Sequence, residues 1–235
     1  MAEAARSSRL IDRARRQPSA ILLATQLLGV LIYPYLGESR AGTSAVSLFG
    51  LLVLALAVWS VEKTSWTVWV SIALGAPSVV FTLCQLMSEA AVWRAWGSGF
   101  EAVFYFYAAF SLIAYMLADR DITRDELFAV GTTFTLLAWA FAHLYVVTQV
   151  IWPGSFTAAV NADEPRTWME LLFLSFTTLS STGLSDVVPV LPHARSFVMI
   201  EQVAGLAYVA MIVSWMVGLT VARARAREGS VDKLN

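Results

Sequence analysis

The chain alternates between long apolar segments and short polar connections. Six apolar segments are long enough, or nearly so, to cross a hydrocarbon core of about 30 Å as helices, which takes about 20 residues each. A seventh, Trp168–Leu179, has only 12 residues and is predicted to enter the membrane and return to the same side. The six predicted spans are Ser19–Leu36, Ser44–Val61, Ser65–Met87, Phe100–Ala118, Leu127–Val150 and Arg195–Val221.

Composition supports a membrane protein. Of the 235 residues, 58% are hydrophobic and only 14% are charged, which excludes most classes of soluble protein. The net charge of −1 provides no basic excess for a nucleic-acid partner. The single cysteine, Cys84, forms neither a disulfide framework nor a CxxC metal site. We therefore expect an all-α membrane protein surrounded by lipid.

Basic residues are unevenly distributed between the two sides of the membrane that six crossings define. Twelve of the 16 Lys and Arg residues fall on the side of the termini, and Arg40, Arg94, Arg166 and Arg195 fall on the other. Because cytoplasmic loops carry the positive excess, both termini are predicted to be cytoplasmic and the chain to cross the plasma (inner) membrane several times. A signal peptide is the alternative for the first span, but its apolar run is longer than the usual h-region of about 7 to 15 residues.

The connections between the spans are too short to form a soluble catalytic or nucleotide-binding domain, so function is expected within the membrane. The chain contains no HExxH, GxSxG or paired His/Cys motif, and no enzymatic activity is expected. A secondary transporter usually has two broken helices in matching repeats, whereas this sequence has one re-entrant segment. That class is a weaker alternative.

The short segment Trp168–Leu179 ends abruptly in the polar run Ser180–Gly183. Irregular backbone at membrane depth is tolerated only where it is buried in protein or lines water. A half-helix followed by such a run therefore predicts a pore or cavity lined by carbonyl and hydroxyl oxygens.

Here the sequence resembles the potassium-channel superfamily, in which an outer helix, a pore helix, a TVGYG-type filter and an inner helix surround a fourfold axis. Phe176–Leu179 resembles the end of the pore helix, and Ser181–Asp186, with the sequence STGLSD, falls on the filter TVGYGD. Val187–Pro189 continues the match, and Glu201–Ala210 is similar to inner helices of small bacterial members. The resemblance covers Leu127–Val221 and implies a homotetramer with six spans, one re-entrant pore helix and a filter loop per chain.

The resemblance also implies where the ion passes. The filter falls on Ser181, Thr182, Gly183, Leu184 and Ser185, whose carbonyl oxygens are expected to hold potassium or sodium; no other cofactor is expected. Asp186 follows at the outer mouth, where four copies form an acidic ring that concentrates cations. An aspartate that only hydrogen-bonds the pore helix is the alternative.

The inner helix supplies the remaining candidates. Gly205 falls at the family's glycine hinge, and Glu201 and Gln202 are expected to brace the pore helix or filter from behind. An apolar stripe at helical spacing either lines the cavity, where it can close the pore by dewetting, or packs helices together. Its members are Leu206, Val209, Val213 and Val217.

The filter departs from the family pattern at the positions that decide ion choice. Leu184 replaces tyrosine and Ser185 replaces the second glycine, while Gly183 and Asp186 are unchanged. We expect Ser185 to pay a left-handed backbone penalty of roughly 1 to 2 kcal/mol. The predicted function is a cation channel with weaker potassium selectivity than a TVGYG pore. A non-conducting, modulatory channel relative is the alternative.

The predicted organisation has four parts: a basic cytoplasmic N-terminus (1–18), a four-helix bundle resembling a voltage sensor (19–118), the pore domain (119–222) and a cytoplasmic tail (223–235). The fourth span carries no Lys or Arg. Moving one charge through the field is worth about 2.3 kcal/mol per 100 mV, so this bundle is not expected to confer steep voltage dependence. Glu101 and His143 are ionisable residues within the spans; for His143 a structural hydrogen bond to a neighbouring helix is favoured, and titration near neutral pH is the alternative.

Overall fold

The computed structural model describes residues 17–36, 49–50, 52–59, 65–87, 91–118 and 124–231, and most of these residues are helical. The predicted span Ser44–Val61 lies only partly within these ranges; residues 49–50 and 52–59 are helical. The N-terminal segment 1–18 lies almost entirely outside them. The helices are α2 (Pro18–Leu36), α4 (Ser65–Met87), α5 (Ala91–Ala118), α6 (Arg124–Ile151), α7 (Trp168–Leu179) and α8 (Pro192–Val231).

The helix bounds agree well with the hydrophobic pattern. α4 and α7 begin and end where predicted, whereas α5 and α8 are longer than the apolar segments they contain. α8 begins with Pro192, which suits a first helical position, and continues through much of the predicted tail. In the described part of the chain, four helices are long and apolar enough to cross a membrane: Pro18–Leu36, Val92–Ala118, Asp125–Ile151 and Pro192–Val221.

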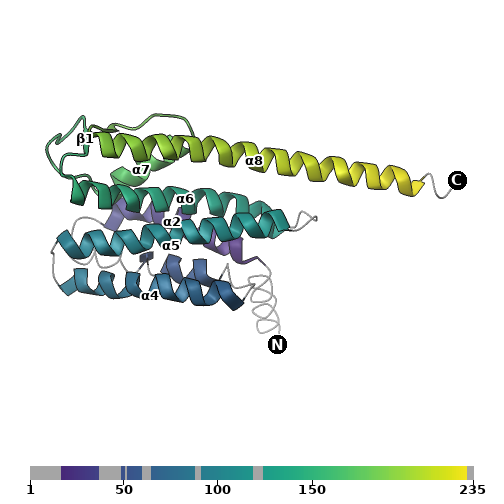
Figure 1. Ribbon diagram of the computed structural model, residues 1–235, viewed down its shortest axis with the longest axis horizontal. Coiled ribbons are helices and arrows are strands. Elements are labelled where there is room, and N and C mark those ends of the chain that lie inside the picture. The colour runs from purple at the N-terminus through teal and green to yellow at the C-terminus, as the bar shows by residue number, and fades with distance from the viewer. Residues whose placement is uncertain are drawn as a thin grey trace.

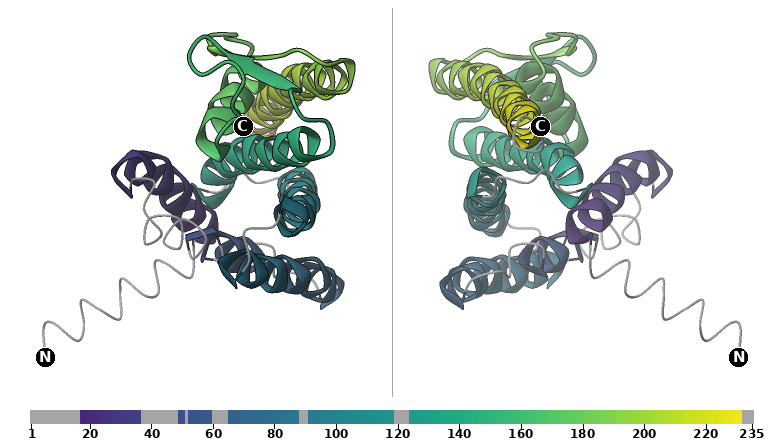
Figure 2. Two further views of the ribbon diagram at one scale, coloured as in Figure 1. Left: turned by 90° about the vertical axis from the view of Figure 1, so that its left-hand side faces the viewer. Right: turned by 90° about the vertical axis from the view of Figure 1, so that its right-hand side faces the viewer.

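The helix α6 occupies the centre of the molecule. Figure 2 shows α7 and α8 on one side of α6, α5 and then α4 on the opposite side, and α2 at the flank. Accordingly, 67% of the most apolar stretch of α6 is buried, against 17% for α8. Most of α8 is left uncovered by the rest of the chain.

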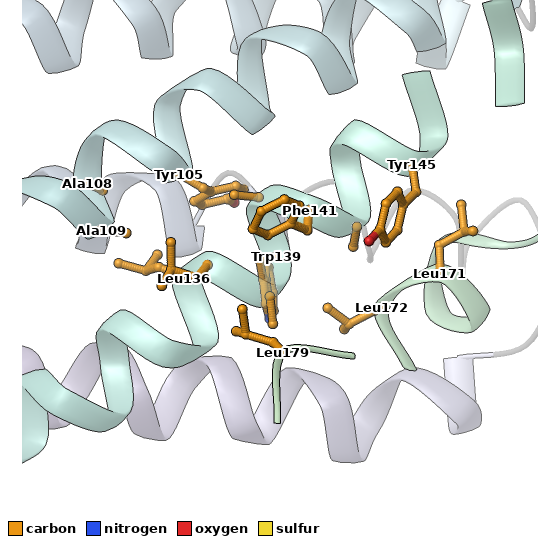
Figure 3. Close-up of a cluster of buried hydrophobic side chains, with 14 of the residues drawn as sticks. Tyr105, Ala108, Ala109, Leu136, Trp139, Phe141, Tyr145, Leu171, Leu172 and Leu179 are labelled. Carbon is orange, nitrogen blue, oxygen red and sulfur yellow. The ribbon is translucent and has the colours of Figure 1, made fainter. Parts of the chain in front are cut away.

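A single hydrophobic core extends across α5, α6 and α7. Tyr105 of α5, Leu136 and Trp139 of α6, and Leu171 and Leu179 of α7 all belong to it (Figure 3). The N-terminal helices therefore pack directly on the outer helix of the pore segment. The boundary predicted between residues 118 and 119 crosses this core, and the division into bundle and pore domain stays a prediction.

Polar groups hold α2 against α6. The backbone N–H of Ser19 donates to Asp125 Oδ1 at 3.1 Å, so a carboxylate at the start of α6 caps the start of α2. Thr132 Oγ1 donates to the Ser19 carbonyl at 2.8 Å, and Thr135 Oγ1 donates to Gln26 Oε1 at 2.7 Å. Pairing of this kind stabilises polar side chains between membrane helices.

A two-stranded ribbon accompanies the helices, and the described part of the chain remains nearly all helical, as expected for an all-α protein. β1 (Phe156–Ala158) pairs with β2 (Val187–Pro189) in antiparallel register, with Phe156 opposite Pro189. Runs of three residues are too short for an alternating pattern to be recognised in the sequence. The ribbon lies at the end of the molecule opposite the C-terminus (Figure 1) and ties the α6–α7 connection to the residues that follow the filter segment.

Candidate functional site

The pore helix α7 begins with a capping box. Thr167 Oγ1 accepts a hydrogen bond from the backbone N–H of Glu170, and Glu170 Oε2 accepts one from the backbone N–H of Thr167 at 2.6 Å. Two backbone donors at the helix start are thereby satisfied. Glu170 is thus an acidic residue in the first turn, where it also interacts favourably with the helix dipole.

A buried arginine fastens the loop that precedes α7. Arg166 is only 5% exposed, and its Nη1 donates to Glu170 Oε1 at 3.2 Å. Its backbone N–H and carbonyl pair with the side-chain amide of Gln149 at 3.0 and 2.8 Å. The guanidinium donors also reach the carbonyl oxygens of Val160, Asn161 and Glu164. From the sequence, Arg166 was only one of four basic residues on the outer side.

We expect Arg166→Met to lower the midpoint of thermal unfolding in detergent, because it removes the hydrogen bonds of the buried guanidinium to the carbonyl oxygens of Val160, Asn161 and Glu164 and its ion pair with Glu170, at a cost of about 3 kcal/mol in total. Arg195→Met is the matched control. Arg195 is exposed and makes one side-chain hydrogen bond, to the Pro189 carbonyl at 3.3 Å, so its replacement should change stability by less than about 0.5 kcal/mol. Equal midpoints for the two variants would contradict the fastening role.

The polar run after α7 folds back onto the last turn of the helix. The N–H groups of Thr182 and Gly183 both donate to the carbonyl oxygen of Thr177, at 2.9 and 3.0 Å, and that of Ser181 donates to the Thr178 carbonyl at 3.0 Å. Ser181 and Gly183 have φ of 61° and 66°. Left-handed backbone on either side of Thr182 lets successive N–H groups converge on one oxygen.

This arrangement fixes the direction of three carbonyl groups. In a trans peptide plane, the carbonyl of one residue points opposite to the N–H of the next, and the described residues contain no cis peptide bond. Because the N–H groups of residues 181 to 183 point at α7, the carbonyls of Ser180, Ser181 and Thr182 point away from it. These residues are exposed in the protomer.

The left-handed backbone conformations occur at residues other than the one that the sequence suggested. Ser185 was expected to be left-handed, yet the left-handed residues of this segment are Ser181 and Gly183. Ser185 Oγ instead accepts the N–H of Val187 at 3.1 Å, a local turn that leads into β2. The hydroxyl of Thr182 donates back to the Thr177 carbonyl at 3.2 Å.

The outer end of the segment is open. Leu184 is 78% exposed and Asp186 is also exposed. Within the described part of the chain, the Asp186 carboxylate has no hydrogen bond or ion pair with the pore helix. With Ser185 between them, they end the predicted filter and mouth, and β2 begins at Val187.

The inner helix α8 presents two different faces. Glu201 and Gly205, one turn apart, are buried against α7, and a Cβ on Gly205 would lie 2.1 Å from the carbonyl oxygen of Leu179. α8 is continuous through Gly205, so the glycine permits close helix approach in this structure. Gln202 and the predicted stripe of Leu206, Val209, Val213 and Val217 are exposed.

Glu201 joins three helices. Its Oε2 contacts the hydroxyl of Tyr145 from α6, and its Oε1 contacts the hydroxyl of Ser175 from α7. Sequence reasoning singled out Glu201 but missed both partners. A serine inside an otherwise apolar pore helix was the one available signal for Ser175, since polar groups in such helices need a partner.

The structure also brings together Glu101 and His143, which the sequence treated separately. Glu101 Oε2 lies 2.9 Å from His143 Nδ1, linking α5 to α6. The His143 ring centroid lies 5.7 Å from that of Trp168, the first residue of α7. This contact matches the structural reading of His143 as a residue paired with a neighbouring helix.

Comparison with known proteins identifies the segment that contains this site. Residues 129–221 match the model of the Ion_trans_2 family, which is described as an ion channel. The match covers most of α6, all of α7 and α8 as far as Val221, and it supports the similarity of this segment to ion-channel domains of the potassium-channel superfamily. No curated protein and no solved structure matches the chain.

Proposed function

We propose that four copies of the chain form a channel for monovalent cations, with the Ser180–Gly183 segments around the central path. The observation that carries this proposal is the outward direction of three successive carbonyls, those of Ser180, Ser181 and Thr182. Carbonyl oxygens in rings replace the hydration shell of an ion. One protomer offers such oxygens from one side only, so a ring of copies is needed to surround the ion.

The free face of α8 supports assembly around an axis. Leu206, Val209, Val213 and Val217 are exposed along one helical stripe of the protomer. In the proposed tetramer these residues line the cavity below the filter. Four apolar side chains at each level form rings that close the path by dewetting when α8 helices approach one another.

The altered outer filter favours weak discrimination between potassium and sodium. The alternation of left-handed residues ends at Gly183, and the side chain of Leu184, unlike that of tyrosine, has no hydroxyl to donate or accept a hydrogen bond. The ordered set of carbonyls is therefore short. Asp186, exposed beyond it, supplies the acidic ring that attracts cations of either kind.

The proposed channel does not sense voltage. α5 contains a single basic residue, Arg94, in its exposed first turn, which corrects the expectation of a helix without any. One such charge per subunit supplies little of the energy for steep gating. The C-terminal end of α8 lies opposite the end that carries the β1–β2 ribbon (Figure 1), which supports the proposal that the C-terminus is cytoplasmic and the filter faces outward in the plasma membrane.

Purified protein in liposomes is expected to pass potassium and sodium down their gradients, with a reversal potential in mixed salts clearly displaced from the potassium equilibrium value. Ion flux and single-channel recording measure both properties. Absence of flux across pH and lipid compositions would contradict the channel and favour the non-conducting alternative.

A filter variant makes the selectivity test specific. Leu184→Tyr combined with Ser185→Gly restores the family residues at the two outer positions and is expected to move the reversal potential toward that of potassium. Val188→Tyr is a suitable control, because Val188 is also exposed but lies in β2. Unchanged selectivity in the double variant would argue against Leu184 and Ser185 lining the path.

A further inference from the structure

Two hydroxyl groups and one carboxyl group meet behind the predicted filter. If the carboxyl group were ionised, their oxygen–oxygen contacts would outnumber the hydrogens available to form hydrogen bonds. Ser175 Oγ lies 2.9 Å from the carbonyl oxygen of Ala138 and also contacts Glu201 Oε1. The hydroxyl of Tyr145 contacts the other carboxyl oxygen, Glu201 Oε2. Ser175, Tyr145 and Glu201 are each completely buried.

The number of hydrogens decides the protonation state. A serine hydroxyl has one hydrogen to donate, and both a carbonyl oxygen and an ionised carboxylate are acceptors only. If Glu201 were ionised, the single hydrogen of Ser175 could serve only one of its two contacts. The other contact would bring two acceptor oxygens together with no hydrogen between them. With a proton on Oε1, Glu201 donates to Ser175, Ser175 donates to Ala138, and Tyr145 donates to Oε2, so every contact is a hydrogen bond.

The surroundings also disfavour a charge on Glu201. In the described part of the chain, no Lys, Arg or His forms an ion pair with it. Tyr145 is the titratable group that faces it from α6, and α7 presents the hydroxyl of Ser175. An isolated carboxylate buried among membrane helices is strongly unfavourable, whereas a hydrogen-bonded neutral acid is not.

The Glu201 carboxyl group is placed so that its protonation state affects the position of the filter segment. Glu201 and Gly205 are one turn apart on α8, and their partners Ser175 and Leu179 are one turn apart on α7. These two contacts fix the register of the inner helix against the pore helix. Leu179 directly precedes Ser180, whose carbonyl is the first of the three that face away from α7.

We propose that Glu201 binds one proton per subunit as a neutral carboxylic acid, and that this proton holds the pore helix between α6 and α8. When the carboxyl O–H bond breaks at alkaline pH, the proton passes to water and the carboxylate draws the Ser175 hydrogen away from the Ala138 carbonyl. The pore helix then loses this hydrogen bond to α6, and only apolar packing holds it there. The resulting loss of ion flux rests on the proposed channel function, but the neutral acid and its effect on stability do not.

Infrared difference spectroscopy of the full-length protein in detergent tests the protonation state. Subtracting the spectrum of Glu201→Gln from that of the native protein at neutral pH is expected to reveal the C=O band of a carboxylic acid. Asp163→Asn, which changes an exposed carboxylate, should instead remove carboxylate bands. A carboxylate band in the Glu201 difference spectrum would overturn the proposal, with or without ion flux.

The pH profile supplies the second readout. The glutamine amide donates to Ser175 and accepts from Tyr145 at every pH. The unfolding midpoint of the native protein should therefore fall at alkaline pH, whereas that of Glu201→Gln should stay close to the native value at neutral pH. Flux should follow the same pattern. If the native protein and Glu201→Gln lost stability equally at alkaline pH, the regulatory role would be overturned. If the carboxylic-acid band and a pH-dependent unfolding midpoint were found but no ion flux, the proton site would be supported and only the channel function contradicted.

A further variant covers the case in which Glu201→Gln does not fold. Tyr145→Phe removes only the hydrogen bond to Glu201 Oε2. The carboxylic-acid C=O band of Tyr145→Phe is expected at higher frequency than that of the native protein, because the Glu201 C=O loses a hydrogen-bond donor. Subtracting the two spectra reveals this shift. An acid band that does not respond would show that the acid lies elsewhere in the protein and would overturn the assignment to Glu201.

Discussion

Replacing Gly205 by alanine is expected to lower the thermal unfolding midpoint and abolish ion flux. The added Cβ would lie 2.1 Å from the carbonyl oxygen of Leu179, a backbone atom that cannot move aside as a flexible side chain does. Overpacking of this kind costs typically about 1 to 3 kcal/mol. The shift that relieves it also moves the end of the pore helix, from which the filter begins.

Gly218→Ala is the control, because it adds the same methyl group to the same helix. No atom of the described chain lies within 4 Å of a Cβ on Gly218. Alanine is the better helix former by about 1 kcal/mol, so this variant should be as stable as the native protein or slightly more so. Unfolding midpoints measured in detergent compare the two variants. Similar midpoints would contradict a close approach of α8 to α7 at Gly205.

Replacing Gly183 by alanine is expected to stop ion flux while leaving the fold intact. Gly183 has φ of 66° and open space around its Cα, so the penalty for alanine is conformational, about 1 to 2 kcal/mol in each subunit. Relief requires φ to become negative. That change withdraws the N–H of Gly183 from the Thr177 carbonyl and turns the preceding carbonyl, of Thr182, away from the ion path.

Gly154→Ala separates backbone strain from filter function. Gly154 has φ of 79°, also with open space, but it lies in the loop between α6 and β1. Both alanine variants should lose similar stability, and only Gly183→Ala should lose flux when flux is normalised to the protein incorporated in liposomes. Equal flux in the two variants would argue that Gly183 lies outside the ion path.

Much of the helical architecture is predictable because the bilayer imposes a simple rule on length and polarity. The bounds of α4 and α7 are those of their apolar runs. The ends of α5 and α8 differ because polar residues such as Arg94 and His193 remain helical where the apolar pattern has stopped. The hydrophobic pattern measures contact with lipid and core, whereas backbone hydrogen bonding sets where a helix ends.

The sequence predicts where the filter loop falls but not how its backbone folds. The motif around Gly183 carries that prediction, whereas the left-handed conformation of Ser181 depends on the Thr177 carbonyl, which accepts from two N–H groups. Likewise, Glu201 is an evident intramembrane carboxylate. Its partner Tyr145 is 56 residues away in the chain, and no local pattern reveals such a pair.

By itself, the sequence determined that the chain is a helical membrane protein with one apolar segment too short to cross the bilayer, because transfer of side chains to lipid depends on each residue almost independently. Only the tertiary structure decided which way the carbonyls of Ser180, Ser181 and Thr182 point, why Gly205 must be small and how Glu201 is held. These properties arise from contacts between α6, α7 and α8, where the positions of atoms from distant segments, and not their types, set the energy.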